Sequence, residues 1–405
     1  MAPFARGESS GKPGRDMSGR RMHTRAWAPV LLSVAGLALV GPVPSAQALS
    51  QTADPGFQTN GRVTSVVTFK NTVYIGGSFT SVRPSGSPAG TGEVARAHLA
   101  AFRLDTGALR SWNPGANGTV SALALSPDKR SLYVGGNFTE LNGKTRHDIG
   151  AVARKSGETM KYKANTNAPV LAIAVTKKRV FLGGSFTTIK DKKRKHVGAT
   201  NHKGRLLLKW KPQVADVVRS LAISRDKSRV YVGGDFSAVN KHRHEHVVAL
   251  SVTAGKVLKW KSPVSYAVWD IVVRKKSVYL GGNGVGGRVG AYSALGKRAW
   301  AVQLDGGVQA ISFAHRKVLA GGHFYNVCVG ISPGQTPGFD CPEVRAHRPH
   351  LAAFGAKNGA VKGWSPTVNS PLGVFALTTT KAGVYAGGDF TRVSGVDQQG
   401  LAHFS

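Results

Sequence analysis

The sequence predicts an all-β fold of seven repeated sheets, a seven-bladed β-propeller, on three observations. A nine-residue phrase with two adjacent glycines in an apolar run recurs seven times, as in YVGGNFTEL from Tyr133. Its first glycines are 40 to 66 residues apart, and periods of this size are typical of propellers and solenoids. The apolar runs are four to eight residues long and are bounded by Gly, Pro, Asn, Asp or Lys, which is the pattern of strands. The first glycines of the pairs are Gly76, Gly135, Gly183, Gly233, Gly281, Gly321 and Gly387.

Each repeat is expected to hold four antiparallel strands, and the second repeat shows them in order. VSALALS from Val120 precedes the turn PDKR, and SLYVGGNF follows as the middle strand. A polar loop then leads to IGAVA, and KSGE turns into a short outer strand near Tyr162. A middle strand between two neighbouring sheets is buried on both faces, so its apolar residues are continuous. Glycine weakens a strand interior unless backbones approach closely, and we expect each pair to leave room for an aromatic side chain of the neighbouring sheet.

The outer strand of the last repeat is predicted to come from the N-terminal side of the chain. Six outer strands carry a large aromatic residue, but the chain ends at LAHFS, one strand short. The segment ADPGFQTNG places Phe57 in a similar context. We therefore expect both ends of 49–405 to complete the last sheet and close the ring, whereas a solenoid would need polar caps. The six outer aromatics are Trp112, Tyr162, Trp210, Trp260, Trp300 and Trp364.

Residues 1–48 are predicted to be a secretory signal peptide, which leaves 49–405 as a single propeller domain. Basic residues around Arg20 and Arg21 precede the apolar run WAPVLLSVAGLALVGP, and PSAQA supplies an A-x-A pattern that places cleavage after Ala48. The apolar run is short for a spanning helix, and no later segment is apolar enough to cross a bilayer. We expect a secreted protein, exported by the Sec route or, through the arginine pair, by the twin-arginine route.

The two cysteines, Cys328 and Cys341, lie close together in a stretch rich in Gly and Pro. In an exported protein the expected state of such a pair is a disulfide. Closing so short a loop would stabilise the fold by about 3 kcal/mol in the chain-entropy model.

The charge of +35 favours anionic partners, and the basic loops after three glycine pairs are the most concrete candidates. Between Val170 and Lys276 there are 24 Lys and Arg against six Asp and Glu. In a propeller, these loops emerge on one face beside the connections between blades, where loops of a rigid scaffold carry function. Basic turns are also expected on the opposite face, so a generally solvated basic surface is the alternative interpretation. The candidates for binding a polyanion are Lys144, Arg146, Lys192, Lys193, Arg194, Lys195, Lys241 and Arg243.

Histidines recur just before the third strand, at His98, His196, His246 and His350. Alternation of His242, His244 and His246 would point three imidazoles the same way in a strand, and such a set, with His196, could bind zinc or copper. The alternative is that each histidine caps its own strand, and we expect no cofactor. Asp235 and Asp389 follow glycine pairs where other repeats have Ser, Asn or His, and we interpret their position as an exposed structural one.

The phrase YVGGxF, followed by LAAF, then TG and W-x-P, resembles the delta-60-type repeats of secreted bacterial β-propellers. It is more distantly similar to kelch repeats, which also have a double glycine and a later tryptophan. The resemblance covers residues 51–405 and implies the fold, because the repeated residues are packing residues. It implies no activity.

These observations together predict a secreted, non-catalytic and monomeric propeller that binds an extracellular macromolecule through one loop face. The partner would be a protein or an anionic glycan such as a cell-wall polymer. The alternative is a carbohydrate-active enzyme, a lyase or hydrolase, that acts on an acidic polysaccharide. A nucleic acid is not expected, because the chain has no recognised binding module and its tryptophans occupy packing positions.

Overall fold

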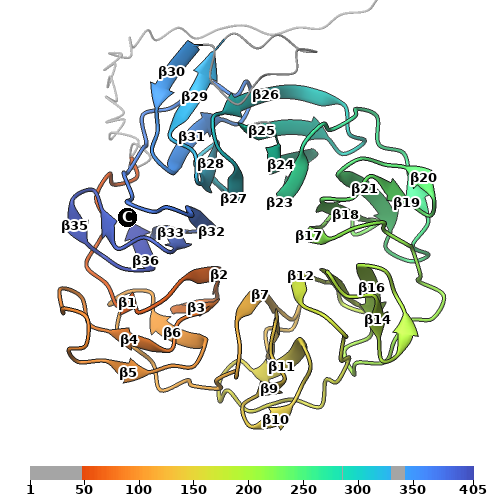
Figure 1. The fold of residues 1–405 in the computed structure, drawn as a ribbon, viewed down its shortest axis with the longest axis horizontal. Helices are drawn as coiled ribbons and strands as arrows, with labels where there is room; N and C mark the ends of the chain where they lie inside the picture. The colour runs from red at the N-terminus through yellow and green to blue at the C-terminus, as the bar shows by residue number, and fades with distance from the viewer. Residues whose placement is uncertain (1–47, 285, 330–342) are drawn as a thin grey trace, which may run out of the picture. The chain divides into compact units, whose positions relative to one another are not determined.

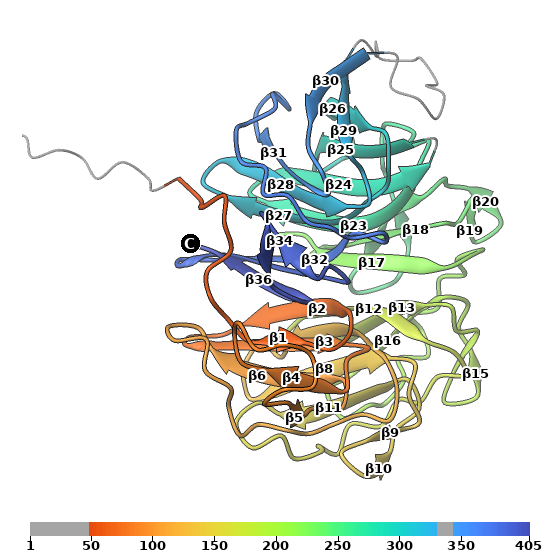
Figure 2. The same ribbon diagram turned by 60° about the vertical axis from the view of Figure 1, so that its left-hand side comes forward.

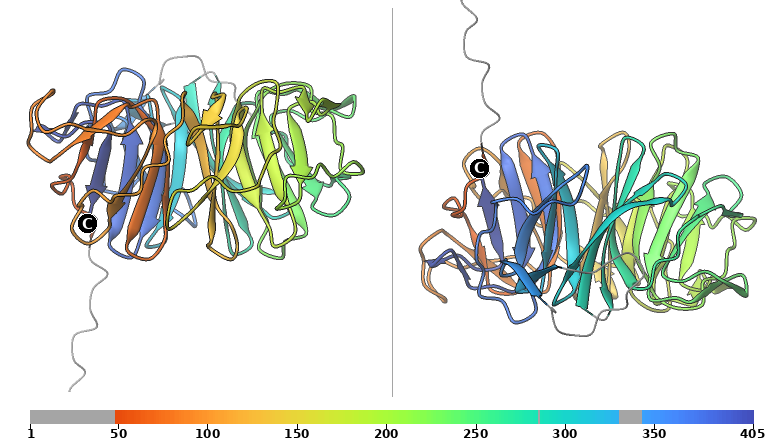
Figure 3. Two further views of the ribbon diagram at one scale, coloured as in Figure 1. Left: turned by 90° about the horizontal axis from the view of Figure 1, so that it is seen from below. Right: turned by 90° about the horizontal axis from the view of Figure 1, so that it is seen from above.

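The computed structural model describes residues 48–284, 286–329 and 343–405, and all of their regular elements are strands. Seven antiparallel sheets, each with a first, a middle and a third strand that follow one another in the chain, are arranged around a ring in this part of the chain (Figure 1). Seen edge-on, their strands run through the thickness of the ring, so that each strand ends at one face or the other (Figure 3). The predicted all-β architecture of repeated sheets is therefore present. None of the elements in these ranges is a helix able to cross a membrane.

Each sheet is built in chain order from the centre outward. The first strands are β2 (Val63–Thr68), β7 (Val120–Leu125), β12 (Val170–Val175), β17 (Val218–Ile223), β23 (Ala267–Arg274), β27 (Val308–Ala314) and β32 (Val374–Thr380). The middle strands, which end in the glycine pairs or just beyond, are β3 (Thr72–Gly77), β8 (Ser131–Gly136), β13 (Val180–Gly184), β18 (Arg229–Gly234), β24 (Ser277–Gly284), β28 (Lys317–Gly322) and β33 (Gly383–Gly388). The third strands are β6 (Leu99–Arg103), β11 (Ile149–Ala153), β16 (Val197–Thr200), β21 (Val247–Ser251), β25 (Gly286–Ser293), β31 (Leu351–Gly355) and β36 (Leu401–Phe404).

The fourth, outer strand is short in most sheets. It is a regular strand in two of them, as β22 (Val257–Leu258) and β26 (Arg298–Leu304). In four others it is reduced to a single bridge to the third strand, such as that between Phe102 and Leu109. Four of the six outer aromatics that follow, Trp112, Tyr162, Trp210 and Trp364, are buried, and each packs edge-on against another aromatic, as Trp112 does against Tyr74 at 5.1 Å.

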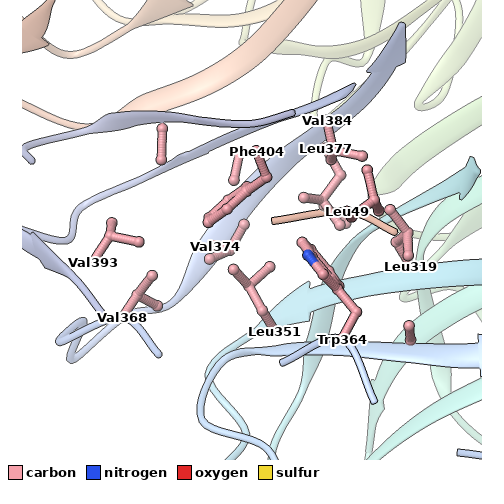
Figure 4. Packing of buried hydrophobic residues seen from close by; sticks show 14 of the residues in the cluster. Leu49, Leu319, Leu351, Trp364, Val368, Val374, Leu377, Val384, Val393 and Phe404 are labelled. Atoms are coloured by element: carbon pink, nitrogen blue, oxygen red, sulfur yellow. The ribbon is translucent and has the colours of Figure 1, made fainter. Parts of the chain in front are cut away.

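The last sheet takes its outer edge from the N-terminal segment. Asp54 forms a bridge with His403 of β36, and the Ser50 N–H donates to the Ser405 carbonyl at 2.7 Å. Figures 1 and 2 show this segment running past the end of β36. Asp54 precedes Phe57 by three residues, as Leu109 precedes Trp112, so Phe57 occupies the outer aromatic position. In the same region Leu49 lies with Trp364 and Phe404 in one apolar cluster (Figure 4).

The two glycines of each pair have different neighbours. A Cβ on Gly183 would lie 2.4 Å from a methyl group of Val218 in the next sheet, and one on Gly184 would lie 2.1 Å from the Pro169 carbonyl oxygen of its own sheet. The same two kinds of neighbour recur around the ring. The predicted close approach is correct, but the expected aromatic neighbour was wrong. The space beside the first glycine is taken by a β-branched side chain of the next inner strand.

Small two-stranded ribbons grow from the loops after the glycine pairs and lie at the rim of the ring (Figure 1). Four are β9 (Glu140–Leu141) with β10 (Lys144–Thr145), β14 (Thr188–Ile189) with β15 (Lys192–Lys193), β19 (Ala238–Val239) with β20 (His242–Arg243), and β34 (Arg392–Val393) with β35 (Val396–Asp397). In the first sheet β4 (Ser81–Arg83) pairs with both β5 (Val94–Ala95) and β1 (Gln58–Thr59). Bridges such as Val214 to Val239 join the ribbons to the connections between sheets, so ribbons and connections share a face, which we call the ribbon face.

The fifth sheet departs from this pattern. Its middle and third strands form one long hairpin around the shortened loop, where Gly284 stands in place of the usual phenylalanine. Its outer strand continues through a Leu304–Val327 pair into β29 (Asn326–Val329) and β30 (Glu343–His347), which belong to the sixth repeat. Nearly all of the predicted signal peptide and Cys341 lie outside the described residues, so the signal and the disulfide with Cys328 remain predictions.

Candidate functional site

The predicted lysine candidates lie on the ribbons and are exposed. Lys192, Lys193 and Lys195 lie on or beside β15, and Lys241 precedes β20 on the next ribbon. The Val214 N–H donates to the Lys195 carbonyl, and Val214 also forms a bridge with Val239 of β19. The ribbons of the third and fourth sheets are therefore connected through a single residue. The four exposed lysines therefore lie on two ribbons that follow one another along the rim, with Lys144 on the ribbon before them.

Two of the predicted arginines serve a structural purpose instead. Arg194 is 5% exposed, and its guanidinium donates to the carbonyls of Lys193, Leu207 and Leu208. Arg146 donates likewise to the carbonyls of Thr145, Met160 and Tyr162. Arg96 and Arg348 repeat this arrangement in other sheets, where the arginine ties the ribbon to the outer edge. Guanidinium groups used in this way are not free to bind a polymer.

The remaining arginine, Arg243, is exposed and donates to Glu245 at 2.7 Å. A surface ion pair of this kind contributes about 0–1 kcal/mol, so the pair does not prevent Arg243 from meeting an external anion. Glu140 and Asp191 are also exposed on these ribbons. The ribbon face is basic, with acids interspersed.

The recurring histidines occupy a position that demands an unusual backbone. His98, His196, His246 and His350 all have φ between 61° and 65°, and Asp148 shares this position with φ 64°. Left-handed backbone is uncommon for residues other than glycine, and His, Asn and Asp are enriched in it. The Nδ1 atoms of His98, His196 and His350 lie 2.9–3.2 Å from backbone carbonyls.

The proposed imidazole set does not form a common strand. The strand β20 includes only His242 and Arg243, and His246 lies beyond it in left-handed backbone. Among the residues that the structure describes, no group of three or more His, Cys, Asp or Glu is placed to hold a metal ion. The repetition of histidine therefore has a local, conformational cause.

A site that sequence reasoning missed lies where the first strands begin, at the mouth of the central channel. Each first strand has a bulge after its initial valine, which leaves one residue unpaired there. These residues line a cavity of about 490 Å³ on the ribbon-face side. They are Thr64, Ser121, Leu171, Arg219, Trp269, Gln309 and Phe375. The first three sheets therefore line one side of the channel mouth with small or aliphatic residues. The other four sheets line the opposite side with large aromatic and polar residues.

Two arginine–aspartate pairs flank the large side of the mouth. Arg219 binds Asp235 with contacts of 2.7–2.8 Å and stacks on Trp269, whose indole N–H also donates to Asp235. Arg62 stacks on the Phe375 ring at 4.6 Å and lies 4.0 Å from Asp389. Our interpretation of Asp235 and Asp389 as exposed structural positions was wrong, because both carboxylates are shielded and engage arginines at the mouth.

Asp270 is the acid that lies deepest in the mouth. Its carboxylate accepts the backbone N–H groups of Ile271 and Ile311 at 2.8 Å and the Ser220 hydroxyl at 3.4 Å, so it connects three neighbouring sheets. Burial raises the pKa of Asp270 to about 6, and the two N–H donors and the hydroxyl only partly offset this effect. Beside it, the buried Oε1 of Gln309 has no hydrogen-bond partner among the described residues.

We expect Asp270 to make stability fall as the pH rises. Because its folded-state pKa of about 6 exceeds the ordinary 3.8, the folded protein binds the proton more tightly than the unfolded chain. Relative to Asp270→Ser, which introduces the residue found at the equivalent Ser65 and Ser220, wild-type protein should lose on the order of 2 kcal/mol of unfolding free energy between pH 4 and pH 7. Urea unfolding at several pH values measures this difference, in which the titration of histidines common to both proteins cancels. A difference that stays constant with pH would contradict it.

One signal could have found the mouth residues in the sequence. When the seven first strands are aligned on their valines, the next position varies from Thr and Ser to Arg, Trp, Gln and Phe within an otherwise regular repeat. Variation in one column of a repeat is typical of a surface that is free of packing constraints. Asp270 stands out in the same way, because the equivalent residues are Ser or Ala.

Comparison with known proteins identifies the fold. The WD40 β-propeller domain of Doa1 matches with a TM-score of 0.57 over 88% of this chain and 97% of that domain, at 11% identity. The computationally designed protein Ika8 matches with a TM-score of 0.51 over 88% of this chain and all of that protein, at 13% identity. The fold is that of a β-propeller. No family model and no curated protein matches the sequence, and similarity at these identities carries no information about the ligand.

Proposed function

We propose that this protein is a non-catalytic scaffold that binds an anionic extracellular glycan through its ribbon face. The observation that carries the proposal is the connection through Val214 between two ribbons, on or beside which Lys192, Lys193, Lys195 and Lys241 lie exposed. Mobile ammonium groups on a rigid support attract a polyanion without demanding one geometry.

The channel mouth supports a glycan over a protein as the partner. It opens on the same face, because the first strands begin where the ribbons are rooted. Trp269, Phe375, Arg219 and Gln309 line its cavity, where an arginine stacks on one face of each of the two aromatic rings. Aromatic faces stack on the C–H surface of sugar rings, while planar polar groups bind pairs of hydroxyls. A cavity of about 490 Å³ is within the range of small-ligand sites.

The proposal predicts that neutralising the ribbon lysines weakens binding to a long sulfated glycan. We expect the variant Lys192→Gln, Lys193→Gln, Lys195→Gln and Lys241→Asn, called the ribbon variant, to elute from heparin at a clearly lower salt concentration than wild type. Each exposed ion pair contributes about 0.2–1 kcal/mol, so the loss of four should lower affinity by about fourfold or more. Lys241 has a φ of 68°, which asparagine tolerates.

The control must remove the same charge elsewhere. Lys70→Asn, Lys129→Asn, Lys155→Gln and Lys203→Gln also remove four positive charges, at exposed turns of the first three sheets away from the ribbons. An equal shift for both variants would mean that only net charge matters, and the ribbon face would then not be the site.

Further parts of the proposal are supported mainly by the sequence. We propose that the chain is exported after removal of residues 1–48, that Cys328 pairs with Cys341, and that the mature protein is a monomer. We also propose that it is a seven-bladed propeller of the delta-60-repeat type, closed by the N-terminal outer strand. The pairing of Asp54 with His403 supports the closure.

One observation favours the alternative of an enzyme acting on an acidic polysaccharide. Asp270 lines the channel with a pKa of about 6, which is the property of a general acid. Both of its oxygens already accept hydrogen bonds from neighbouring sheets, which supports a structural role instead. Incubation of wild-type protein with acidic polysaccharides, followed by size analysis of the products, separates the two. If wild-type protein shortens the polysaccharide and the Asp270→Ser variant does not, the enzyme alternative would replace the scaffold proposal.

A further inference from the structure

A cationic groove lies on the face opposite the ribbons, which we call the turn face because the hairpin turns between first and middle strands form it (Figure 3). One cavity of about 1010 Å³ lies over the fifth, sixth and seventh sheets. A second, of about 620 Å³, lies over the fourth and fifth and shares Lys275 and Ser277 with the first. The two cavities therefore adjoin at Lys275 and Ser277, and we call them together the turn-face groove.

The groove is lined by cations with almost no acid. The charged or titratable residues of the larger cavity are Arg274, Lys275, His315, Arg316, Lys357 and Lys381 besides Tyr279, and none of the described residues that line it is a carboxylate. The smaller cavity adds Arg225, Arg229 and Lys276, with Asp226 as the single acid. Hydrogen bonds from Ser224 and Ser228 hold the pKa of Asp226 at about 2, so this carboxylate is already occupied. The ribbons, in contrast, carry Glu140, Asp191 and Glu245 among their lysines.

The local structure holds these cations in place. Lys275, His315 and Arg316 lie in two-residue turns with φ of 53°, 42° and 64°. Lysines with φ above zero also occupy the equivalent turns of the first, second and fourth sheets, at Lys70, Lys129 and Lys227, so this backbone is a feature of the repeat. Arg274 stacks across to Phe313 of the next sheet at 5.2 Å.

One arginine of the groove has unused hydrogen-bonding capacity, as have several arginines elsewhere in the described residues, such as Arg194 and Arg348. The Nη1 atom of Arg229 is buried and has no hydrogen-bond partner among the described residues. A buried guanidinium nitrogen without an acceptor is unfavourable, and an anionic oxygen in the adjacent cavity would satisfy it. The exposed ammonium and guanidinium groups around it would bind further anionic groups along a chain.

We infer that the turn-face groove is a second binding site, for a segment of an acidic polysaccharide that carries sulfate or carboxylate groups. A volume of about 1010 Å³ is at the upper end of small-ligand pockets and suits several consecutive sugar units. The aromatics of the groove do not offer a stacking surface for bases, since Tyr279 is buried and Phe313 is covered by Arg274. Single-stranded nucleic acid is bound through such exposed stacking platforms, which favours the polysaccharide.

The groove variant Lys275→Asn, Arg316→Asn, Lys357→Gln and Lys381→Gln tests the inference. It removes the same charge as the ribbon variant, and asparagine suits the two left-handed positions. Titration calorimetry with a heparin hexasaccharide at physiological salt compares wild type with both variants. We expect the groove variant to lose one binding event, or to weaken it by about fourfold or more, while the ribbon variant keeps it. Circular dichroism and urea unfolding show whether the variants are folded.

The outcomes separate this inference from the proposed function. Hexasaccharide binding that is the same in wild type and groove variant, or absent from wild type, would overturn the groove site. If the wild type binds one hexasaccharide and only the groove variant loses this binding, the result would support the groove site and count against the ribbon face as a binding site. Equal or tighter binding of a single-stranded DNA of matched charge would overturn the choice of polysaccharide.

Discussion

Replacing Gly184 with alanine is expected to destabilise the protein by at least about 3 kcal/mol, a large effect for one methyl group. The added Cβ would lie 2.1 Å from the Pro169 carbonyl oxygen and 3.1 Å from the Val170 Cα. Both neighbours are backbone, and the same carbonyl accepts the Ser185 N–H, so relief requires separating two paired strands. Alanine restricts the unfolded chain and so returns only about 0.4–1 kcal/mol.

Two further alanine substitutions make this prediction specific. Gly183→Ala should cost less, about 1–3 kcal/mol, because its closest neighbour is a methyl group of Val218 that can move. Gly363→Ala should be nearly neutral, since no atom lies within 4 Å of its added Cβ. Urea unfolding of the three variants gives the order. If Gly184→Ala unfolds at the same urea concentration as Gly363→Ala, the account of the glycine pair is wrong.

The repeated sheets could be predicted because their determinants are local and occur seven times. Strand length, turn residues and glycine spacing are all legible within one repeat, and repetition averages out exceptions such as Gly284. The neighbour of each first glycine could not be predicted in the same way. Whether Val218 or an aromatic side chain faces Gly183 depends on how adjacent sheets are staggered, and no spacing within a repeat encodes that stagger.

The candidate site was predictable only in part, because net charge does not reveal what a charged side chain already binds. Lys192 and Arg194 are nearly adjacent in a basic run, yet one is exposed and the other is buried against carbonyls. A continuing strand would place Lys192 and Arg194 on the same face, but β15 ends at Lys193, so the period of the strand could not predict that Arg194 is buried. The channel mouth and the groove gather residues from four or more sheets, whose sequence separations exceed a hundred residues.

Removing residues 48–57 is expected to have the second large effect, a loss of at least about 5 kcal/mol or failure to fold. The truncation deletes the buried Leu49 and the outer aromatic Phe57, worth about 1.5–3 kcal/mol each, and leaves the Trp364 indole N–H without the Ser50 carbonyl at 2.9 Å. It also exposes the edge of β36, which pairs with Asp54. A chain that begins at Ala48 is the control and should unfold like the full-length protein.

A closed ring and an open array of sheets should respond differently to the removal of residues 48–57. In an open array each sheet depends on its immediate neighbours, so removing one edge strand would affect the last sheet and leave the distant ones intact. Here the first strands of all seven described sheets pack in sequence, and β32 packs against β2, so the last sheet supports two neighbours at once. We therefore expect the truncated chain 58–405 to unfold at lower urea throughout, in one transition, and a synthetic peptide of residues 48–58 to restore it with increasing concentration. Unfolding at the same urea concentration as 48–405, or a local loss confined to the last sheet, would show that the N-terminal segment does not hold the ring closed.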